Sequence, residues 1–142
     1  MEINLFFESG ITLENRSKLK LFLTSLFKRE KKPLESLVYV FCSDDYLLGI
    51  NRQYLDHDFY TDIISFDLGE SKRSPVVGEI YISTDRVREN AKSNNASLKK
   101  ELHRVIFHGA LHLCGYKDKS EKEKEQMRKK EDEYLMLYGL QG

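Results

Sequence analysis

An apolar segment toward the carboxyl end of this 142-residue chain carries two histidines four residues apart, His108 and His112. The apolar residues around them recur at helical spacing, and residues four apart on a helix project from the same face. Gly115 follows three residues after His112 and can take the left-handed conformation that ends a helix. The segment is therefore predicted to form a helix that presents both imidazoles on one side and ends in a sharp turn.

The two imidazoles and the carboxylate of Asp118 form a candidate metal site. After a turn at Gly115, Asp118 can return to the side of the helix that bears His108 and His112. A lone histidine pair is a weak signal, because histidines on half-apolar helices are often hydrogen-bonded core residues; the added glycine and carboxylate favour a metal. Three protein ligands leave one position for water or substrate, which is typical of catalytic zinc sites.

The spacing of residues 108, 112, 115 and 118 is also that of metzincin proteases, but one residue argues against that activity. Those proteases carry a glutamate directly after the first histidine, where it acts as the general base. This chain has Gly109 at that position. Peptide hydrolysis by that mechanism is therefore not expected.

The same segment closely resembles the signature of the YbeY family, bacterial metal-dependent endoribonucleases of ribosomal RNA maturation. The signature reads H-G-x-L-H-L-x-G-Y-D-H, and residues 108–118 read H-G-A-L-H-L-C-G-Y-K-D. Residues 51–54 (N-R-Q-Y), 61–66 (T-D-I-I-S-F) and 78–83 (G-E-I-Y-I-S) are similar to further family segments. The resemblance covers most of the chain.

The resemblance implies one YbeY-like metalloprotein domain over residues 1–142. His108 and His112 would be its catalytic residues and would hold, with Asp118, one Zn²⁺ per chain. The implied function is a single-strand-specific endoribonuclease that acts in maturation of the 16S ribosomal RNA 3′ end and in ribosome quality control. Its partners would be ribosomal RNA and the small ribosomal subunit or associated proteins. The sequence does not indicate the oligomeric state.

Two departures from the family pattern bear on the site. The third family ligand is histidine, and this chain has Asp118; two histidines and one carboxylate suit zinc but also Fe, Mn or Ni. Leu55 stands where the family has an arginine assigned to catalysis or RNA contact. Leucine cannot stabilise phosphate charge, so either another cation serves, with Arg52 and His57 nearest in sequence, or activity is altered.

Three other functions stay open at this stage. The loss of the family arginine favours a ribosome-assembly factor with a structural metal and little nuclease activity. A metallohydrolase of another substrate fits as well, because a metal site specifies chemistry better than substrate. A non-haem iron oxygenase also uses two histidines and a carboxylate, but it ranks last because these ligands come from one helix and its exit.

Charge and hydropathy restrict the class of partner and the cellular location that are expected for the chain. The chain has 23 Lys and Arg against 23 Asp and Glu, which argues against a generic, strongly basic nucleic-acid binder. The charges are nevertheless segregated: basic residues gather in the expected helices and acidic ones between residues 44 and 67, so a local basic face can contact phosphates. No apolar run is long enough to span a membrane, no signal peptide is evident, and a cytoplasmic protein is expected.

Local patterns predict an α+β fold, a four-stranded mixed sheet with helices packed on it. The YbeY resemblance implies the same fold, with a metal cleft beside the histidine helix. Strands are expected at residues 2–8, 36–43, 63–68 and 76–83. Helices are expected from Thr12 as N-cap to residue 28, after Ser43 or Asp44 to residue 55, after Thr84 to residue 94, after Ser97 through the histidines, and from residue 120 to 138.

Glu101 lies two helical turns before His108, on the same side of the histidine helix. It is too distant to bind the same ion. It is expected either to orient a ligand from behind or to be an acid favoured by the dipole in the first turn of the helix.

Overall fold

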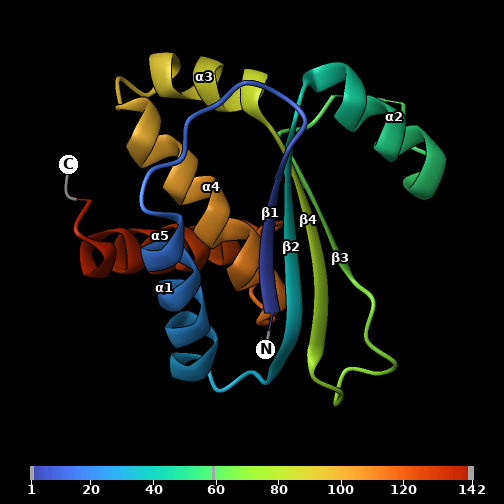
Figure 1. Ribbon diagram of the computed structural model, residues 1–142, viewed down its shortest axis with the longest axis vertical. Helices are drawn as coiled ribbons and strands as arrows, with labels where there is room; N and C mark the ends of the chain where they lie inside the picture. Colours follow the sequence, from blue (N-terminus) through green and yellow to red (C-terminus); the bar gives the residue numbers. More distant parts are fainter. Residues whose placement is uncertain (1, 59, 141–142) are drawn as a thin grey trace.

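The computed structural model describes residues 2–58 and 60–140 (Figure 1), and its elements follow the expected order. In chain order they are β1 (Glu2–Phe7), α1 (Arg16–Arg29), β2 (Leu34–Cys42), α2 (Asp44–Leu55), β3 (Ile63–Asp67), β4 (Val76–Ser83), α3 (Thr84–Ser93), α4 (Leu98–Leu113) and α5 (Glu121–Tyr138). The α+β prediction is confirmed. None of the helices in the described ranges is long and apolar enough to cross a bilayer.

The sheet is mixed, with strand order β1-β2-β4-β3. β1 and β4 both run parallel to β2, while β3 is antiparallel to β4, with Ile63 opposite Ile82 and Asp67 opposite Gly78. The parallel pairs are reached through crossovers that contain α1 and α2, and a polar loop over residues 68–75 joins β3 to β4. β3 is therefore an edge strand of this sheet.

Helices α1 and α4 lie on one face of the sheet and α5 packs on α4 from outside, while α2 lies against the other face near one end (Figure 1). The main core forms between the sheet and these three helices, and Ile106, Phe107 and Leu111 of α4 are fully buried in it. Burial of each such side chain contributes about 1.5–3 kcal/mol. α4 is therefore held firmly against the sheet.

Gly109 allows α4 to approach the sheet closely. A Cβ atom at this position would lie 3.0 Å from side-chain carbons of Ile63 on β3 and Ile80 on β4. Gly109, which stands where metzincins have their catalytic glutamate, is here the point at which the helix contacts the sheet. This contact brings the two residues that flank it on the helix face, His108 and His112, over the edge strand.

Two predicted N-caps were wrong, by three residues for α1 (Asn15 rather than Thr12) and by one residue for α3 (Ser83 rather than Thr84). α1 begins at Arg16 rather than after Thr12, because Ile11 and Leu13 are both buried, as alternate residues of an extended chain would be. α3 is capped by Ser83, whose side-chain oxygen accepts a hydrogen bond from the Arg86 amide. The Thr84 hydroxyl instead donates to the Cys42 carbonyl oxygen.

A capping box starts α5 directly after the segment that carries Asp118. The Ser120 hydroxyl accepts a hydrogen bond from the Glu123 amide, and the Glu123 carboxylate accepts one from the Ser120 amide. We expect Ser120→Ala to lower the free energy of unfolding by about 1 kcal/mol in urea denaturation. Ser93→Ala, at an exposed position in the last turn of α3, is the control and should change it by less than about 0.5 kcal/mol. Equal effects of the two substitutions would contradict the capping role.

Candidate metal centre

The turn that brings Asp118 back begins at the end of α4. The Tyr116 amide donates to the Leu111 carbonyl and the Gly115 amide to the His112 carbonyl, the two bonds of a Schellman motif. Gly115 has φ of 109°, a conformation that residues with a side chain rarely adopt. The left-handed turn expected at this glycine is confirmed.

His108, His112 and Asp118 meet where that turn closes. The Nε2 atom of His108 lies 3.2 Å from Oδ2 of Asp118, and Nε2 of His112 lies 3.4 Å from the same oxygen. Each of the three residues offers one possible ligand atom, and these three atoms all lie within 4.8 Å of one another. The three side chains are partly exposed, so a bound ion would be reachable from solvent. The sequence therefore identified a group that the fold brings together.

Glu131 of α5 fixes the orientation of the first histidine. Nδ1 of His108 is 2.6 Å from Oε2 of Glu131, so this nitrogen donates a proton to the carboxylate and leaves the Nε2 lone pair directed at the site. The other Glu131 oxygen accepts from Arg104 at 3.0 Å, and Arg104 also donates to Asp132. Glu131 and Arg104 are both buried, so each neutralises the other away from water.

The charges around His108 set its proton affinity. Burial of the ring opposes protonation, but the hydrogen bond to Glu131 and the negative charges of Glu131, Asp118 and Asp62 outweigh it and raise the pKa of His108. These carboxylates would stabilise a cation at the same place. The donor set, two imidazole nitrogens and a carboxylate with one imidazole anchored from behind, fits a zinc-type divalent ion.

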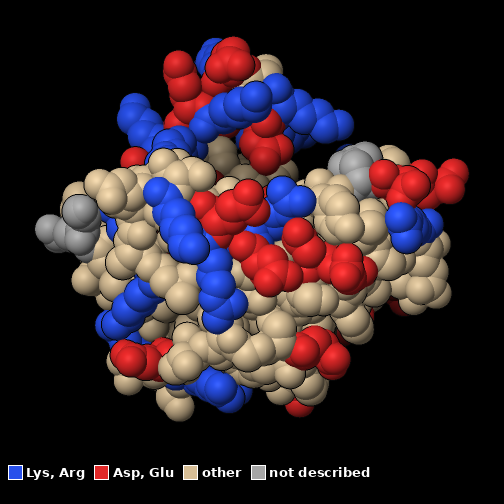
Figure 2. Space-filling model, turned by 90° about the horizontal axis from the view of Figure 1, so that it is seen from above, with Lys and Arg blue, Asp and Glu red and all other residues tan. Residues whose placement is uncertain are grey.

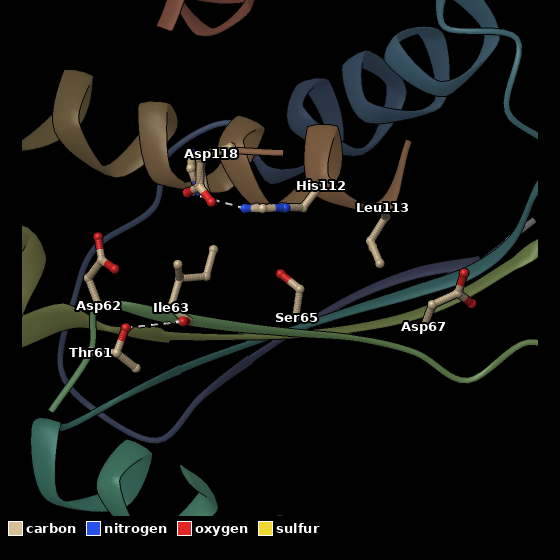
Figure 3. Close-up of a pocket in the computed structure, with 9 residues that line it drawn as sticks. Thr61, Asp62, Ile63, Ser65, Asp67, His112, Leu113 and Asp118 are labelled. Atoms are coloured by element: carbon tan, nitrogen blue, oxygen red, sulfur yellow. Dashed lines mark hydrogen bonds and ion pairs between the residues drawn. The ribbon is translucent and has the colours of Figure 1, made fainter. Parts of the chain in front are cut away.

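A cleft of about 560 Å³ opens in front of the three ligands, between α4 and the edge strand β3. Figure 3 shows Asp62, Ile63 and Ser65 rising from β3 and the residue before it toward α4. Burial raises the pKa of Asp62; the nearby His108 lowers it in part, while the charges of Asp118 and Glu131 add to the increase. The cleft thus holds a second carboxylate that can take up a proton beside the ligand group.

The segment that carries Asp118 is also tied to α1. The Tyr116 hydroxyl donates to Oε1 of Glu30 at 2.7 Å, and the Tyr134 hydroxyl donates to the other oxygen. Burial alone would raise the pKa of Glu30, but the hydrogen bonds from Tyr134 and Tyr116 and the charge of Lys130 lower it. A charged Glu30 therefore anchors Tyr116, two residues before Asp118.

The residues considered as substitutes for the family arginine lie outside the cleft. Neither Arg52 nor His57 lines it, and Arg52 forms an ion pair with Asp58; Leu55 itself is exposed at the end of α2. None of the residues that line the cleft is Lys or Arg, as far as the described chain shows. Figure 2, which looks down on the end of the molecule where α2 and α3 lie, shows acidic side chains gathered in the middle of that surface and basic ones around them. Positive charge opposite a phosphate must therefore come from the ion itself or from cations beyond the cleft.

Two functional candidates were not found from the sequence. Glu131 lies in a Glu/Lys-rich helix whose pattern indicates only a solvated face. It is Glu131, and not Glu101, that orients His108 from behind. Asp62 lies in a family-like segment, and its position in the sequence alone indicates no role for it. Neither assignment could be made without the packing of α5 and β3 on α4.

Comparisons with known proteins identify the family. The model of the family described as endoribonuclease YbeY matches residues 9–139. Proteins named endoribonuclease YbeY from Cytophaga hutchinsonii and Christiangramia forsetii are 53% and 44% identical, over 88% and 99% of this chain and 87% and 96% of their own. The solution structure of a Thermotoga maritima protein, 28% identical, superimposes with a TM-score of 0.61 over 96% of this chain and 91% of that one.

Glu131→Gln tests the anchoring of His108. Glutamine keeps the shape but removes the charge that holds the imidazole and pairs with Arg104, so we expect zinc affinity to fall by about 10–100-fold in chelator competition. Asp132→Asn is the matched control, because Asp132 contacts Arg104 but not His108 and is largely exposed. Similar zinc affinity in the two variants would contradict a specific role for Glu131.

Proposed function

The chain belongs to the YbeY endoribonuclease family, and from that premise we propose that it hydrolyses single-stranded RNA at the ion held by His108, His112 and Asp118. The endoribonuclease activity, a hydrolase activity on RNA, follows from the family. The assignment of the three residues is carried by one observation: the two Nε2 atoms converge on the same Asp118 oxygen at the floor of the cleft.

We further propose that the ion is zinc, one per chain. When bound, such an ion polarises a phosphoryl oxygen and lowers the pKa of a bound water toward about 7. The protein's own contribution is to hold the ligands in place through Glu131 and to keep the cleft open to a strand. A volume of about 560 Å³ is in the range of small-ligand sites, which suits a short extended piece of RNA better than a duplex.

Asp62 is our candidate for the residue that accepts the proton of the attacking water. It lines the cleft with the ligands, and its raised pKa brings it closer to the neutral range in which a general base works best. The hydroxyl of Ser65 lines the same wall, whereas the Thr61 hydroxyl donates to the Ile63 carbonyl oxygen. Ser65 can therefore donate a hydrogen bond to a phosphate in a cleft whose described lining holds no lysine or arginine.

The cellular role is proposed from the family resemblance. We propose that the chain works as one YbeY-like domain in the cytoplasm, matures the 3′ end of 16S ribosomal RNA and acts in ribosome quality control. Its partners would be the small ribosomal subunit or associated proteins. The metal cleft supports the chemistry of this role, and association with ribosomal particles in cell extracts would test its setting.

His112→Ala and Asp118→Ala test the ligand assignment. We expect the purified wild-type chain to contain about one zinc by mass spectrometry of the metal and to cleave a single-stranded RNA. Both variants should lose the metal and lower cleavage by at least about 100-fold. His57→Ala replaces an exposed histidine outside the cleft lining and should retain both properties. Full cleavage by a metal-free variant would overturn the proposal.

Asp62→Asn separates proton transfer from metal binding. We expect kcat to fall by about 10²–10⁴-fold, because a carboxamide cannot accept the proton, while the zinc content stays at the wild-type level. Asp56→Asn, at an exposed position with a φ of 52° that asparagine tolerates well, is the control. An Asp62→Asn enzyme with wild-type kcat would exclude Asp62 as the base.

A further inference from the structure

A second cavity, of about 420 Å³, lies at the amino end of α4, between the loop that follows α3 and the helix α5. We refer to it as the amino-end pocket. Its polar lining includes Asn94, Asn95, Lys100, Glu101, Arg104 and Arg128. Three cationic side chains therefore gather around one carboxylate here, in contrast to the metal cleft, whose lining holds no lysine or arginine among the described residues.

Glu101 is the unexplained member of this pocket. It is only 5% exposed, yet within residues 2–58 and 60–140 no hydrogen bond and no ion pair within 4 Å reaches its carboxylate. The α4 amide one residue before it is already satisfied by the Ser97 hydroxyl. Among the described residues, the fully buried side-chain polar atoms without a partner are His103 Nε2 and Tyr138 Oη, so the Glu101 oxygens reach the open space of the pocket. The carboxylate is therefore free to accept hydrogen bonds from the donors of a ligand.

The pocket and the metal site share one face of α4. Glu101, Arg104, His108 and His112 follow one another at intervals of three and four residues, which places them in a row along the helix. With a rise of 1.5 Å per residue, the row separates Glu101 from the histidines by roughly 10–17 Å. Arg104 lines the pocket and also donates to Glu131, the residue that holds His108. The two sites are therefore separated along α4 by the buried Arg104–Glu131 pair, at a distance that a few nucleotides can span.

We propose that the amino-end pocket binds an unpaired guanine nucleotide of the RNA, a second contact a few nucleotides from the cleaved bond. The inference rests on the proposed function of the metal cleft. The Glu101 carboxylate accepts hydrogen bonds from N1–H and N2–H of the base. Lys100 and Arg128 bind the phosphate, and the amides of Asn94 and Asn95 are placed to donate to the remaining acceptors of guanine.

Guanine is singled out by the chemistry of a carboxylate, which is an acceptor only. The Watson–Crick edge of guanine presents two neighbouring N–H donors that match its two oxygens. Adenine and cytosine each place a ring acceptor beside their amino group, and uracil flanks its single N–H with two carbonyl oxygens. Each of these three would set a lone pair against Glu101, and an unpaired or repelled buried acceptor weakens binding.

The test is calorimetric titration of the full chain with the four nucleoside 5′-monophosphates. We expect GMP to bind at least about tenfold more tightly than AMP, CMP or UMP, and Glu101→Gln to lower GMP affinity by about tenfold or more and to abolish the preference. Lys100→Ala should weaken GMP by several fold. Its neighbour Lys99, which pairs with Glu14 and does not line the pocket, provides the control Lys99→Ala with wild-type affinity.

Two further measurements separate this proposal from the function of the cleft. His112→Ala, which removes a metal ligand, should still bind GMP with wild-type affinity; loss of GMP binding there would place the nucleotide in the cleft and overturn the proposal. A single-stranded RNA with one guanine should compete with GMP, whereas an RNA without guanine should compete at least about tenfold less well.

Equal affinity for all four nucleotides, or GMP affinity unchanged in a folded Glu101→Gln protein, would also overturn the proposal of a guanine site. Absence of RNA cleavage by the wild-type chain with GMP binding intact would refute the proposed function alone.

Discussion

The enclosure of α4 between the sheet and α5 is the constraint on which the site depends. Its apolar residues, such as Ile106 and Phe107, are buried in the main core, and Gly109 removes the side chain that would hold the helix away from β3 and β4. A helix held this closely cannot rotate without opening the core. The direction of His108 and His112 is therefore set by packing, before any ion is bound.

Two carboxylates, buried Glu131 and partly buried Glu30, fix the orientation that packing sets. Glu131 holds His108 from α5, and Glu30 holds Tyr116 in the segment that carries Asp118. A buried ion pair such as Arg104 with Glu131 is weak evidence for stability, since its desolvation cost can equal the attraction between the charges. Orientation of the ligands is the better explanation, because each carboxylate contacts either a ligand or the segment that carries one.

The sequence predicted well what local spacing determines. The order of elements follows from apolar periodicity, and the turn at Gly115 follows from the conformational freedom of glycine, so the meeting of the histidines with Asp118 could be predicted. Glu131 could not, because helix periodicity does not say which exposed-looking acid of α5 faces α4. The start of α1 was misjudged for a related reason: only the packing of Ile11 and Leu13 shows that the chain there is extended.

The charges of the proposed site have an electrostatic consequence. As a ligand, the Asp118 carboxylate would cancel one unit of the charge of a divalent ion, and no lysine or arginine among the described residues lines the cleft to attract phosphate. The acidic side chain of Asp62 in the same cleft adds repulsion. Binding energy for an anionic strand must then come from outside the cleft, where attraction to phosphate does not depend on the ion. The cations that flank the row of side chains on α4, Lys100 and Arg128, are positioned to supply it.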